Sequence, residues 1–240
     1  MEYHKPVLLK EAVDGLDIKE NGVYVDVTFG GGGHSREILS RLGTFGRLVA
    51  FDQDKDALEN NIQDDRFLLI NENFRYIKRF LRFYKINHVD GILADFGVSS
   101  HQFDIPERGF STRFDSELDM RMDQKSKISA FEIINGYEEM QLANVLKEYG
   151  ELRQARGMAK EIVQQRKSAP IKTGNQLKEV LARFLSPKYE NKVLAQVYQA
   201  IRIEVNQELV ALKEFLLQTE EVLEPGGRLS CISYHSLEDR

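Results

Sequence analysis

The sequence predicts an α/β fold with a parallel sheet, into which an all-helical segment is inserted between the fourth and fifth strands. Strand-like and helix-like segments alternate through about the first hundred residues, a pattern typical of parallel strands joined by right-handed crossovers. A run of four glycines follows the first strand, and three of the strands end in an aspartate. Beyond residue 129 apolar residues recur at helical spacing, and strand-like character returns only near the C-terminus.

The first strand is predicted at 23–25, a short apolar run that ends at Asp26. The glycine turn 30–33 follows it, and residues 34–42 then carry isoleucine and leucine at helical spacing. Gly43 is expected to end this helix, because glycine readily adopts the left-handed conformation found after many helices.

The second and third strands are predicted at 48–51 and 67–70, and Asp52 comes directly after the second. Asp54 is expected to cap a helix that runs to about residue 62, since aspartate side chains accept hydrogen bonds from the first amides of a helix.

A helix over 77–84 and a fourth strand at 89–94, which ends at Asp95, complete the alternating part of the chain. Residues 96–125 show no convincing regular pattern. Residues 129–223, in contrast, are helical throughout, with turn signals but no strand-like run.

The fifth strand is predicted at 229–234, after a turn at 224–227. We therefore expect a discontinuous α/β domain, 1–105 and 220–240, around a domain at 106–219 that consists of a loop and the helical insertion. Only five strands are found and the sequence ends soon after the last one, so a C-terminally truncated sheet is expected.

The composition, 42% hydrophobic and 30% charged residues, is that of an ordinary globular protein. No apolar run approaches the roughly 18 to 20 residues of a membrane helix, and the N-terminus lacks the apolar stretch of a secretory signal. A cytoplasmic protein without membrane attachment is expected. The single cysteine, Cys231, excludes an intramolecular disulfide, and no residues have metal-ligand spacing, so no metal is predicted.

The net charge of −5 argues mildly against a nucleic-acid substrate, because neutralisation of phosphates supplies much of the affinity of RNA-binding proteins. Basic residues are nevertheless concentrated in the segment 75–85 and at Arg108, Arg113 and Arg121. Either group could form a basic patch on an acidic protein. For the segment 75–85, a solvated helix face is the alternative.

The glycine loop and its acids predict an adenosine-containing cofactor at the carboxyl ends of the strands. Asp52 suits two ribose hydroxyls. Gly30 and Gly32 fit the first two positions of the dinucleotide fingerprint G-x-G-x-x-G, but Ser35 occupies the third. Asp26 favours a cofactor with a positive amino group near the loop. S-adenosylmethionine carries such a group and is therefore preferred to NAD, which would make the protein a dehydrogenase.

Distinctive motifs run through nearly the whole chain. They are His4-Lys5-Pro6-Val7-Leu8-Leu9, Asp26-Val27-Thr28-Phe29-Gly30-Gly31-Gly32-Gly33-His34-Ser35, Asp95-Phe96-Gly97-Val98-Ser99-Ser100, Arg108-Gly109-Phe110-Ser111, Leu118-Asp119-Met120-Arg121-Met122-Asp123, Gln199-Ala200-Ile201-Arg202-Ile203, Pro225-Gly226-Gly227-Arg228-Leu229 and Ser233-Tyr234-His235-Ser236-Leu237-Glu238-Asp239-Arg240. Through these motifs the chain resembles the bacterial small-subunit ribosomal RNA cytosine-N4 methyltransferases, the MraW family. Two positions depart from the family pattern: Phe96, where leucine is common, and Tyr234, where phenylalanine is common.

The resemblance implies a class I S-adenosylmethionine-dependent methyltransferase domain, with a Rossmann-like parallel sheet and an inserted all-helical domain. It implies methylation at the exocyclic N4 of a cytidine in the decoding region of 16S rRNA. The cofactor contacts that it implies come from Gly32, Gly33, His34, Asp52, Phe74, Asp95 and Gln102. Asp26 and Gly30 complete the predicted cofactor site.

The amine of cytosine is a poor nucleophile because its lone pair is delocalised into the ring. Asp95, or a backbone carbonyl in the loop that it begins, is expected to accept a proton from N4, and a cofactor contact is its alternative role. The target base must be single-stranded or flipped out of its stack. The predicted substrate-binding residues are Arg108, Phe110, Arg113, Arg121 and His235. Phe96, Phe103 and Phe114 are further candidates for stacking, and for His235 a structural hydrogen bond is the alternative.

Two other functions remain open. DNA amino-methyltransferases typically carry Asp/Ser-Pro-Pro-Tyr/Phe at the fourth strand, where this chain has Asp95-Phe96-Gly97-Val98. A non-catalytic ribosome-assembly factor would bind RNA without methyl transfer, and the intact glycine loop argues against it. The expected partner is small-subunit ribosomal RNA within the assembled subunit, and the protein is expected to be a monomer or a homodimer.

Overall fold

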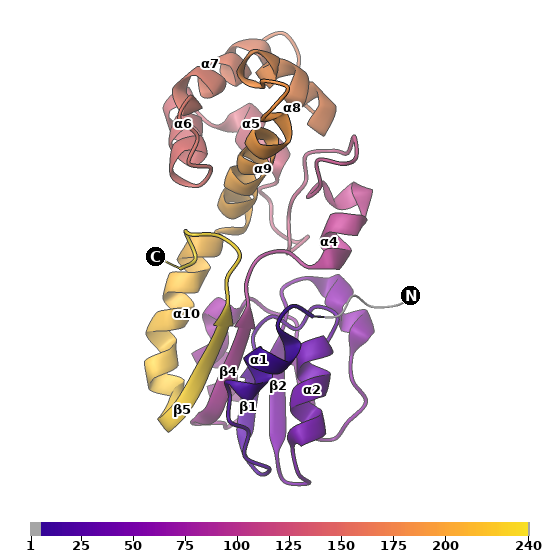
Figure 1. Ribbon diagram of the computed structural model, residues 1–240, viewed down its shortest axis with the longest axis vertical. Coiled ribbons are helices and arrows are strands. Elements are labelled where there is room, and N and C mark those ends of the chain that lie inside the picture. The colour runs from indigo at the N-terminus through magenta and orange to yellow at the C-terminus, as the bar shows by residue number, and fades with distance from the viewer. Residues whose placement is uncertain (1–5, 240) are drawn as a thin grey trace. The chain divides into compact units, whose positions relative to one another are not determined.

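The chain forms two compact units in the computed structural model, which describes residues 6–239 (Figure 1). The first unit comprises Met1–Ser99 and Leu209–Arg240, and the second comprises Ser100–Glu208. His4, Lys5 and Arg240 of the motifs quoted above lie outside the described residues.

The first unit contains a parallel five-stranded sheet in the order β3-β2-β1-β4-β5. Its strands are β1 (Val23–Asp26), β2 (Arg47–Phe51), β3 (Phe67–Ile70), β4 (Val89–Asp95) and β5 (Leu223–Ile232). The five strands predicted from the sequence are all present, and the predicted α/β class is confirmed. The strand order reverses between β1 and β4, the position at which open α/β sheets bind ligands beyond the carboxyl ends of their strands.

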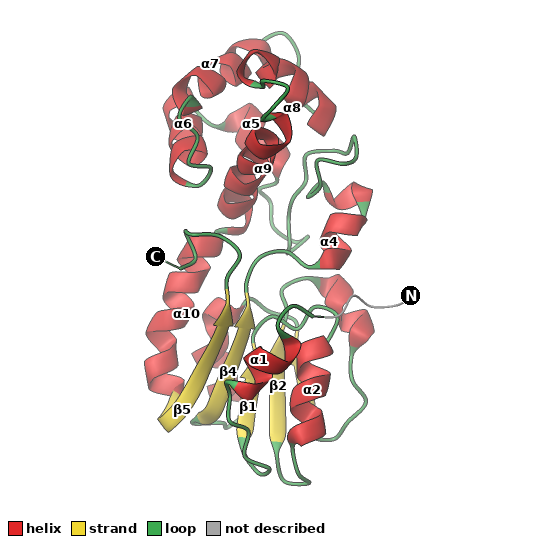
Figure 2. Ribbon diagram, in the orientation of Figure 1, coloured by secondary structure: helices red, strands yellow, loops and turns green. Residues whose placement is uncertain are grey.

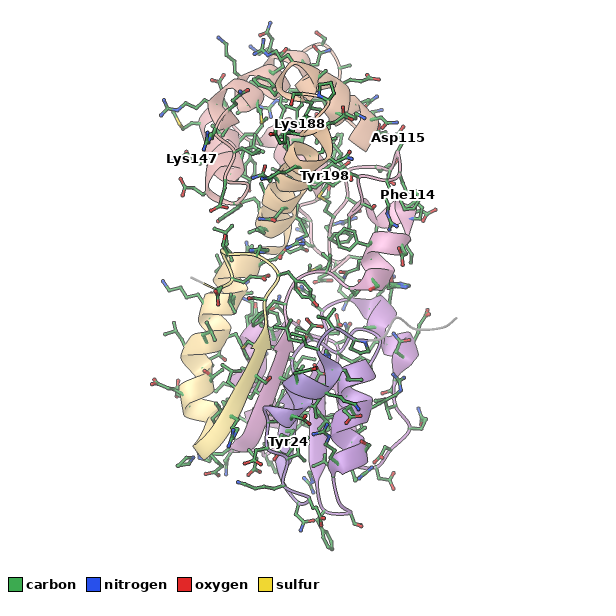
Figure 3. All side chains as sticks on the ribbon, viewed as in Figure 1. Tyr24, Phe114, Asp115, Lys147, Lys188 and Tyr198 are labelled. Carbon is green, nitrogen blue, oxygen red and sulfur yellow. The ribbon has the colours of Figure 1, made fainter. Side chains whose placement is uncertain are left out.

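Helices α1 (Leu9–Asp14) and α2 (Gly33–Arg41) cover one face of the sheet (Figure 1). Successive side chains of a strand point to opposite faces, and Tyr24, Leu48 and Leu93 point to this one. Tyr24, which Figure 3 labels, is fully buried. Its hydroxyl oxygen accepts a hydrogen bond of 2.8 Å from the amide of Lys19. The alternation leaves Asp26, two residues after Tyr24, on the face that α2 covers.

The opposite face is covered by α3 (Ile77–Phe83) and α10 (Glu208–Val222), as Figure 2 shows for α10. Phe215 of α10 is fully buried against this face together with Val25 of β1 and Ile92 of β4. The sequence pattern assigns α10 to the helical insertion, whereas the structure packs it on the sheet. An apolar stripe on a helix fits either partner, so periodicity alone could not distinguish them.

The predicted turn at 224–227 is a bulge within β5. Leu223 pairs with Val89 and Arg228 pairs with Gly91, so residues 224–227 lie opposite Asp90 alone. Gly226 has a φ of +84° in this bulge, in the region that only glycine adopts without strain. The bulge ends the connection from α10 and allows residues 228–232 to pair with the end of β4.

Four short helices differ from the sequence prediction. The segment after β2 is a 3-10 helix, η1 (Lys55–Asn60), in which Asp54 makes the expected cap by accepting a hydrogen bond from the amide of Asp56 at 3.1 Å. The stretch predicted as irregular contains α4 (Ser100–Asp104) and a 3-10 helix, η3 (Pro106–Arg108). A further 3-10 helix, η2 (Phe74–Tyr76), precedes α3.

The second unit is helical after its first loop, as predicted for this stretch (Figure 2). Its longer helices are α5 (Ala130–Gly136), α6 (Glu139–Glu148), α7 (Ala155–Gln165), α8 (Gly174–Leu181) and α9 (Glu190–Asn206), with η4 (Ala182–Phe184) after α8. Helix α6 packs against α7 and α9. Among the described residues, no helix has the length and hydropathy needed to span a bilayer.

Candidate active site

Three carboxylates mark the carboxyl edge of the sheet. Asp26 ends β1, Asp52 directly follows β2 and Asp95 ends β4. Because these strands are parallel neighbours, their ends meet at one edge, where the strand order reverses. The negative charge of Asp26 contributes to raising the pKa of both Asp52 and Asp95. Carboxylates that raise one another's pKa therefore lie at the edge of the sheet where ligands bind in this class of fold.

Both backbone polar groups of Gly30, its N–H and its carbonyl, are hydrogen-bonded to side chains. Its N–H donates to Oδ2 of Asp52 at 2.8 Å, and its carbonyl accepts from Nδ2 of Asn60 at 3.0 Å. Its φ is +49°. Apart from Gly30 itself and its two chain neighbours, no described residue has a heavy atom within 4 Å of the position that a Cβ on Gly30 would occupy. The loop is thus firmly fixed and offers open space directly beside its backbone.

Gly32 and Gly33 are glycines for packing reasons. Gly32 has a φ of +74°, and a Cβ there would lie 2.9 Å from the ring of Phe29. A Cβ on Gly33, the first residue of α2, would lie 2.2 Å from Cγ of Pro6. Both predicted cofactor glycines therefore allow neighbouring segments to close on the loop. Arg36 fixes the loop further by donating to the carbonyl of Gly31 at 2.6 Å.

Asp26 is completely buried. Its Oδ2 accepts a hydrogen bond of 2.6 Å from the hydroxyl of Ser35, and its Oδ1 accepts one of 3.1 Å from the amide of Thr28. Burial raises the pKa of Asp26, and the hydrogen bond from Ser35 opposes that rise. Asp26 therefore ties the start of α2 to the end of β1.

Asp52 is surrounded by backbone donors. Its two carboxylate oxygens accept hydrogen bonds from the amides of Gly30 and Asp54, both at 2.8 Å. Burial raises the pKa of Asp52 to about 7, although these two hydrogen bonds act in the opposite direction. Its backbone carbonyl accepts a hydrogen bond of 2.8 Å from Asn71, which follows β3.

Asp95 keeps part of its side chain exposed, whereas Asp26 is fully buried. Its amide donates to Oγ1 of Thr28 at 2.7 Å, and its Oδ1 accepts from the hydroxyl of Tyr234 at 2.8 Å. Nδ1 of His34 lies 3.9 Å from Oδ2, and about a fifth of the Asp95 side chain, 21%, is exposed. Burial raises the pKa of Asp95, and the hydrogen bond from Tyr234 lowers it again.

His34 and Phe74 belong to the surroundings of this edge. His34 is buried at the start of α2. Its Nε2 lies 3.2 Å from the carbonyl oxygen of Val7, so this nitrogen contacts the segment before α1. The ring of Phe74 packs on Phe96 and Phe215, with centroids 5.9 and 5.4 Å away. Phe74 is only partly buried, and its remaining surface is available to a ligand.

The turn after β5 is organised by Glu238. Its Oε2 accepts a hydrogen bond of 2.9 Å from the amide of Tyr234, and its Oε1 lies 3.2 Å from Nε2 of His235. The amide of Glu238 in turn donates to the carbonyl of His235 at 3.0 Å. Among the described residues neither ring nitrogen of His235 makes a hydrogen bond, so the structural and the substrate role of His235 both stay predictions.

The other predicted site residues lie in the second unit. Gln102 is buried in α4. Arg108 is buried as well, and its Nη2 donates to the carbonyls of Arg121 and Met122 at 2.9 and 3.3 Å. Phe110 is buried beside it, with its ring 5.8 Å from the guanidinium carbon. A phosphate or base contact by Arg108 or Phe110 would require this loop to open.

Arg113 and Arg121 are arranged differently. The side chain of Arg113 is 60% exposed and forms an ion pair of 2.8 Å with Asp104. Arg121 instead makes two hydrogen bonds to its neighbour Asp119 and is 27% exposed. Of these three arginines, Arg113 is the one that the structure leaves most accessible to RNA.

Four residues of the edge were not singled out as site residues from the sequence: Thr28, Ser35, Asn60 and Tyr234. Thr28 and Ser35 lie inside the recognised glycine motif, so their position was a signal that could have identified them. Asn60 and Tyr234 are brought to the loop and to Asp95 only by folding.

The fold and this edge together define a class I methyltransferase domain: a parallel sheet with a reversal beside β1, a glycine loop and an acid after each of the strands around it. The sequence profile of the MraW methylase family matches residues 1–240. The chain belongs to the MraW methylase family.

Individual relatives are similar over the whole chain. A protein of Christiangramia forsetii named Ribosomal RNA small subunit methyltransferase H is 69% identical over 240 residues, which are 100% of this chain and 80% of that protein. Proteins of the same name from Flavobacterium johnsoniae and Bacteroides thetaiotaomicron are 67% and 55% identical over 100% of this chain, and 80% and 79% of their own lengths are covered.

Proposed function

We propose that this chain transfers the methyl group of S-adenosylmethionine to the exocyclic N4 of a cytidine in the decoding region of 16S rRNA. One observation carries the proposed chemistry. Asp95 lies at the carboxyl end of β4 with Oδ1 held by Tyr234, and among the described residues Oδ2 accepts no hydrogen bond. A carboxylate oxygen in this state is available to accept a proton from an amine.

The residues of the edge fit the cofactor. The open space beside Gly30 admits a ligand that lies against the loop backbone. Asp52 beside the loop is the proposed partner of the ribose hydroxyls. Asp26 is fully buried, so its proposed role toward the ammonium of the cofactor involves no direct contact. His34 and the exposed part of Phe74 complete the proposed contacts in this unit. The cofactor contact of Gln102 stays a prediction from the family resemblance. S-adenosylmethionine supplies an electrophilic methyl group on its sulfonium.

The reaction needs placement and one proton acceptor. The N4 lone pair is delocalised into the cytosine ring, so the amine attacks well only when it is held in line with the methyl group. Oδ2 of Asp95 accepts a hydrogen bond from N4–H, which favours a pyramidal nitrogen with its lone pair directed at the methyl carbon. Holding both groups at one edge converts a bimolecular step into an effectively unimolecular one.

The proposed substrate follows from the relatives, which are named as methyltransferases of small-subunit ribosomal RNA. RNA bases are methylated when single-stranded or flipped out, and exposed aromatic and arginine side chains can receive them. In the second unit Phe103 and Phe114 are 39% and 36% exposed. Arg113 is accessible and directly precedes Phe114, which Figure 3 labels. Its Nη2 donates to the backbone carbonyl of Phe103 at 3.2 Å. A net charge of −5 favours a folded subunit, which offers several contacts, over free RNA.

The test is transfer of tritiated methyl groups from S-adenosylmethionine to small ribosomal subunits, followed by nucleoside analysis of the RNA. N4-methylcytidine is the expected product. Another methylated nucleoside would contradict N4 of cytidine as the site of methylation, but not the class of enzyme. Binding of S-adenosylmethionine without transfer to subunits or to free RNA would contradict the proposed substrate. Asp95→Asn should abolish most transfer, and full turnover with unchanged cofactor affinity would exclude Asp95 from both of its proposed roles.

A further inference from the structure

Tyr234 contacts the proposed proton acceptor directly. Its hydroxyl donates to Oδ1 of Asp95 at 2.8 Å, across 139 positions of the sequence. The residue lies just beyond the end of β5 and is 54% exposed. The hydroxyl of an exposed tyrosine can instead hydrogen-bond to water. Its hydrogen bond to Asp95 therefore calls for a structural explanation.

The backbone around Tyr234 holds the ring in this place. Its amide donates to Oε2 of Glu238 at 2.9 Å, which fixes the turn that follows β5. On the other side lies Gly97, with a φ of +99°, and a Cβ there would lie 3.5 Å from Cδ2 of the Tyr234 ring. The ring thus rests beside a backbone segment without a side chain, in the loop that Asp95 begins.

The hydrogen bond distinguishes the two oxygens of Asp95. Oδ1 is occupied by Tyr234, and Oδ2 faces Nδ1 of His34 at a distance of 3.9 Å, too long for a hydrogen bond. The charged or titratable groups that act on Asp95 are Tyr234, His34, Asp26 and Glu238. Among the described residues, the hydrogen bond from the Tyr234 hydroxyl fixes the orientation of the Asp95 carboxylate.

We propose that Tyr234 is a positioning residue for methyl transfer: its hydroxyl holds Oδ1 of Asp95 so that Oδ2 is oriented to take the proton of the substrate amine. The inference rests on the proposed function. In the step, the N4 lone pair forms the bond to the methyl carbon, and the carbon–sulfur bond breaks with its electron pair left on sulfur. The N4 proton passes to Oδ2 of Asp95 and then to water.

The first test needs neither RNA nor turnover. The Asp95 carboxyl carbon, labelled with carbon-13 and assigned from the Asp95→Asn variant, is titrated by NMR in the wild-type protein and in Tyr234→Phe. The hydrogen bond from Tyr234 lowers the pKa of Asp95, so its loss should raise that pKa. An identical titration in the two proteins would show that the hydroxyl does not hold Asp95 and would overturn the inference.

The second test is the pH dependence of methyl transfer to small ribosomal subunits. Tyr234→Phe keeps the ring and loses only the hydroxyl. We expect kcat to fall by about tenfold, the lower range for a hydrogen bond to a charged group, with an unchanged Kd for S-adenosylmethionine. Activity that requires ionised Asp95 is lost as the pH falls through its pKa, so the acidic limb of the profile should move to higher pH.

Tyr76→Phe is the matched control, because Tyr76 belongs to the same unit and is 41% exposed. Tyr76→Phe should leave both kcat and the acidic limb of the pH profile unchanged. An unchanged pH profile and kcat in Tyr234→Phe, with an active wild-type protein, would overturn the inference alone. A wild-type protein without transfer would contradict the proposed function, and the NMR titration would still decide whether Tyr234 holds Asp95.

Discussion

The amide of Gly30 donates to Oδ2 of Asp52 at 2.8 Å, so the acid after β2 fixes the loop after β1. The same carboxylate accepts from the amide of Asp54 through its other oxygen at 2.8 Å. Asp52 therefore stabilises the glycine loop and is also a proposed contact for the ribose. Any change at Asp52 acts on both roles together.

Cofactor affinity should depend on pH through Asp52. Burial raises the pKa of Asp52 to about 7, and the protonated form accepts fewer hydrogen bonds from ribose hydroxyls. We expect the Kd for S-adenosylmethionine to fall by about tenfold as the pH rises from about 6 to about 8. Isothermal titration over this range measures the effect. The Asp52→Asn variant should bind S-adenosylmethionine more weakly, and the pH dependence of its Kd should reflect only the titration of the ligand. The same pH dependence of Kd in the wild-type protein and in Asp52→Asn would contradict the prediction.

Asn60 should matter for the cofactor although it is not an acid. Its Nδ2 donates to the carbonyl of Gly30 at 3.0 Å, and Asn60→Ala frees one side of the loop. We expect the Kd for S-adenosylmethionine to rise by about fivefold to tenfold, the effect of one hydrogen bond. Asn61→Ala is the control, because Asn61 is an exposed neighbour. Similar affinities of the two variants would show that the loop does not depend on Asn60.

Ser35→Ala should destabilise the protein by about 1–3 kcal/mol, because it removes a hydrogen bond of 2.6 Å from the fully buried carboxylate of Asp26. Burial already raises the pKa of Asp26 and Ser35 opposes that rise, so the pKa of the variant is higher. A carboxyl group whose pKa is raised on folding loses stability as the pH rises from its unfolded value towards its folded value. The deficit should therefore be larger at neutral than at acid pH.

Urea unfolding of the Ser35 variant at several pH values measures this deficit. Ser40→Ala is the matched control on the same helix, since the Ser40 hydroxyl donates only to the nearby carbonyl of Glu37 at 2.7 Å on the surface. It should cost well under about 1 kcal/mol at every pH. A deficit in Ser35→Ala that is independent of pH would mean that Asp26 is not the group affected.

Arg113 and Arg108 should respond differently to substitution. Arg113→Glu reverses an exposed charge and should weaken binding to small ribosomal subunits while leaving thermal stability nearly unchanged. The slope of log affinity against log salt should fall by about one. Arg108→Ala removes donors to two backbone carbonyls of the buried loop and should instead lower stability by about 1–3 kcal/mol.

Filter binding over a salt series and thermal unfolding separate these two outcomes. Arg47→Glu, an exposed charge at the opposite end of the sheet from the candidate site, is the control for charge reversal. If Arg113→Glu and Arg47→Glu bind subunits equally, Arg113 does not contact RNA. If Arg108→Ala is as stable as the wild-type protein, the loop is not held by its guanidinium.

The sequence by itself determined the five strands, the glycine loop and the acids at the carboxyl edge. Alternating and helical periodicity reports which residues face a core, and Asp26, Asp52 and Asp95 follow apolar runs closely enough that the sheet must carry them to one edge. The family motifs were visible for the same reason, because each is contiguous in the chain.

The tertiary structure alone decided three further points. It put α10 on the sheet, where Phe215 is buried, although its apolar stripe suits a helical bundle equally well. It buried Arg108, which composition would place in water. It brought Tyr234 to Asp95 across 139 positions. Periodicity specifies which side of an element is apolar, but the partner of a polar side chain is set by the closing of distant segments on one another.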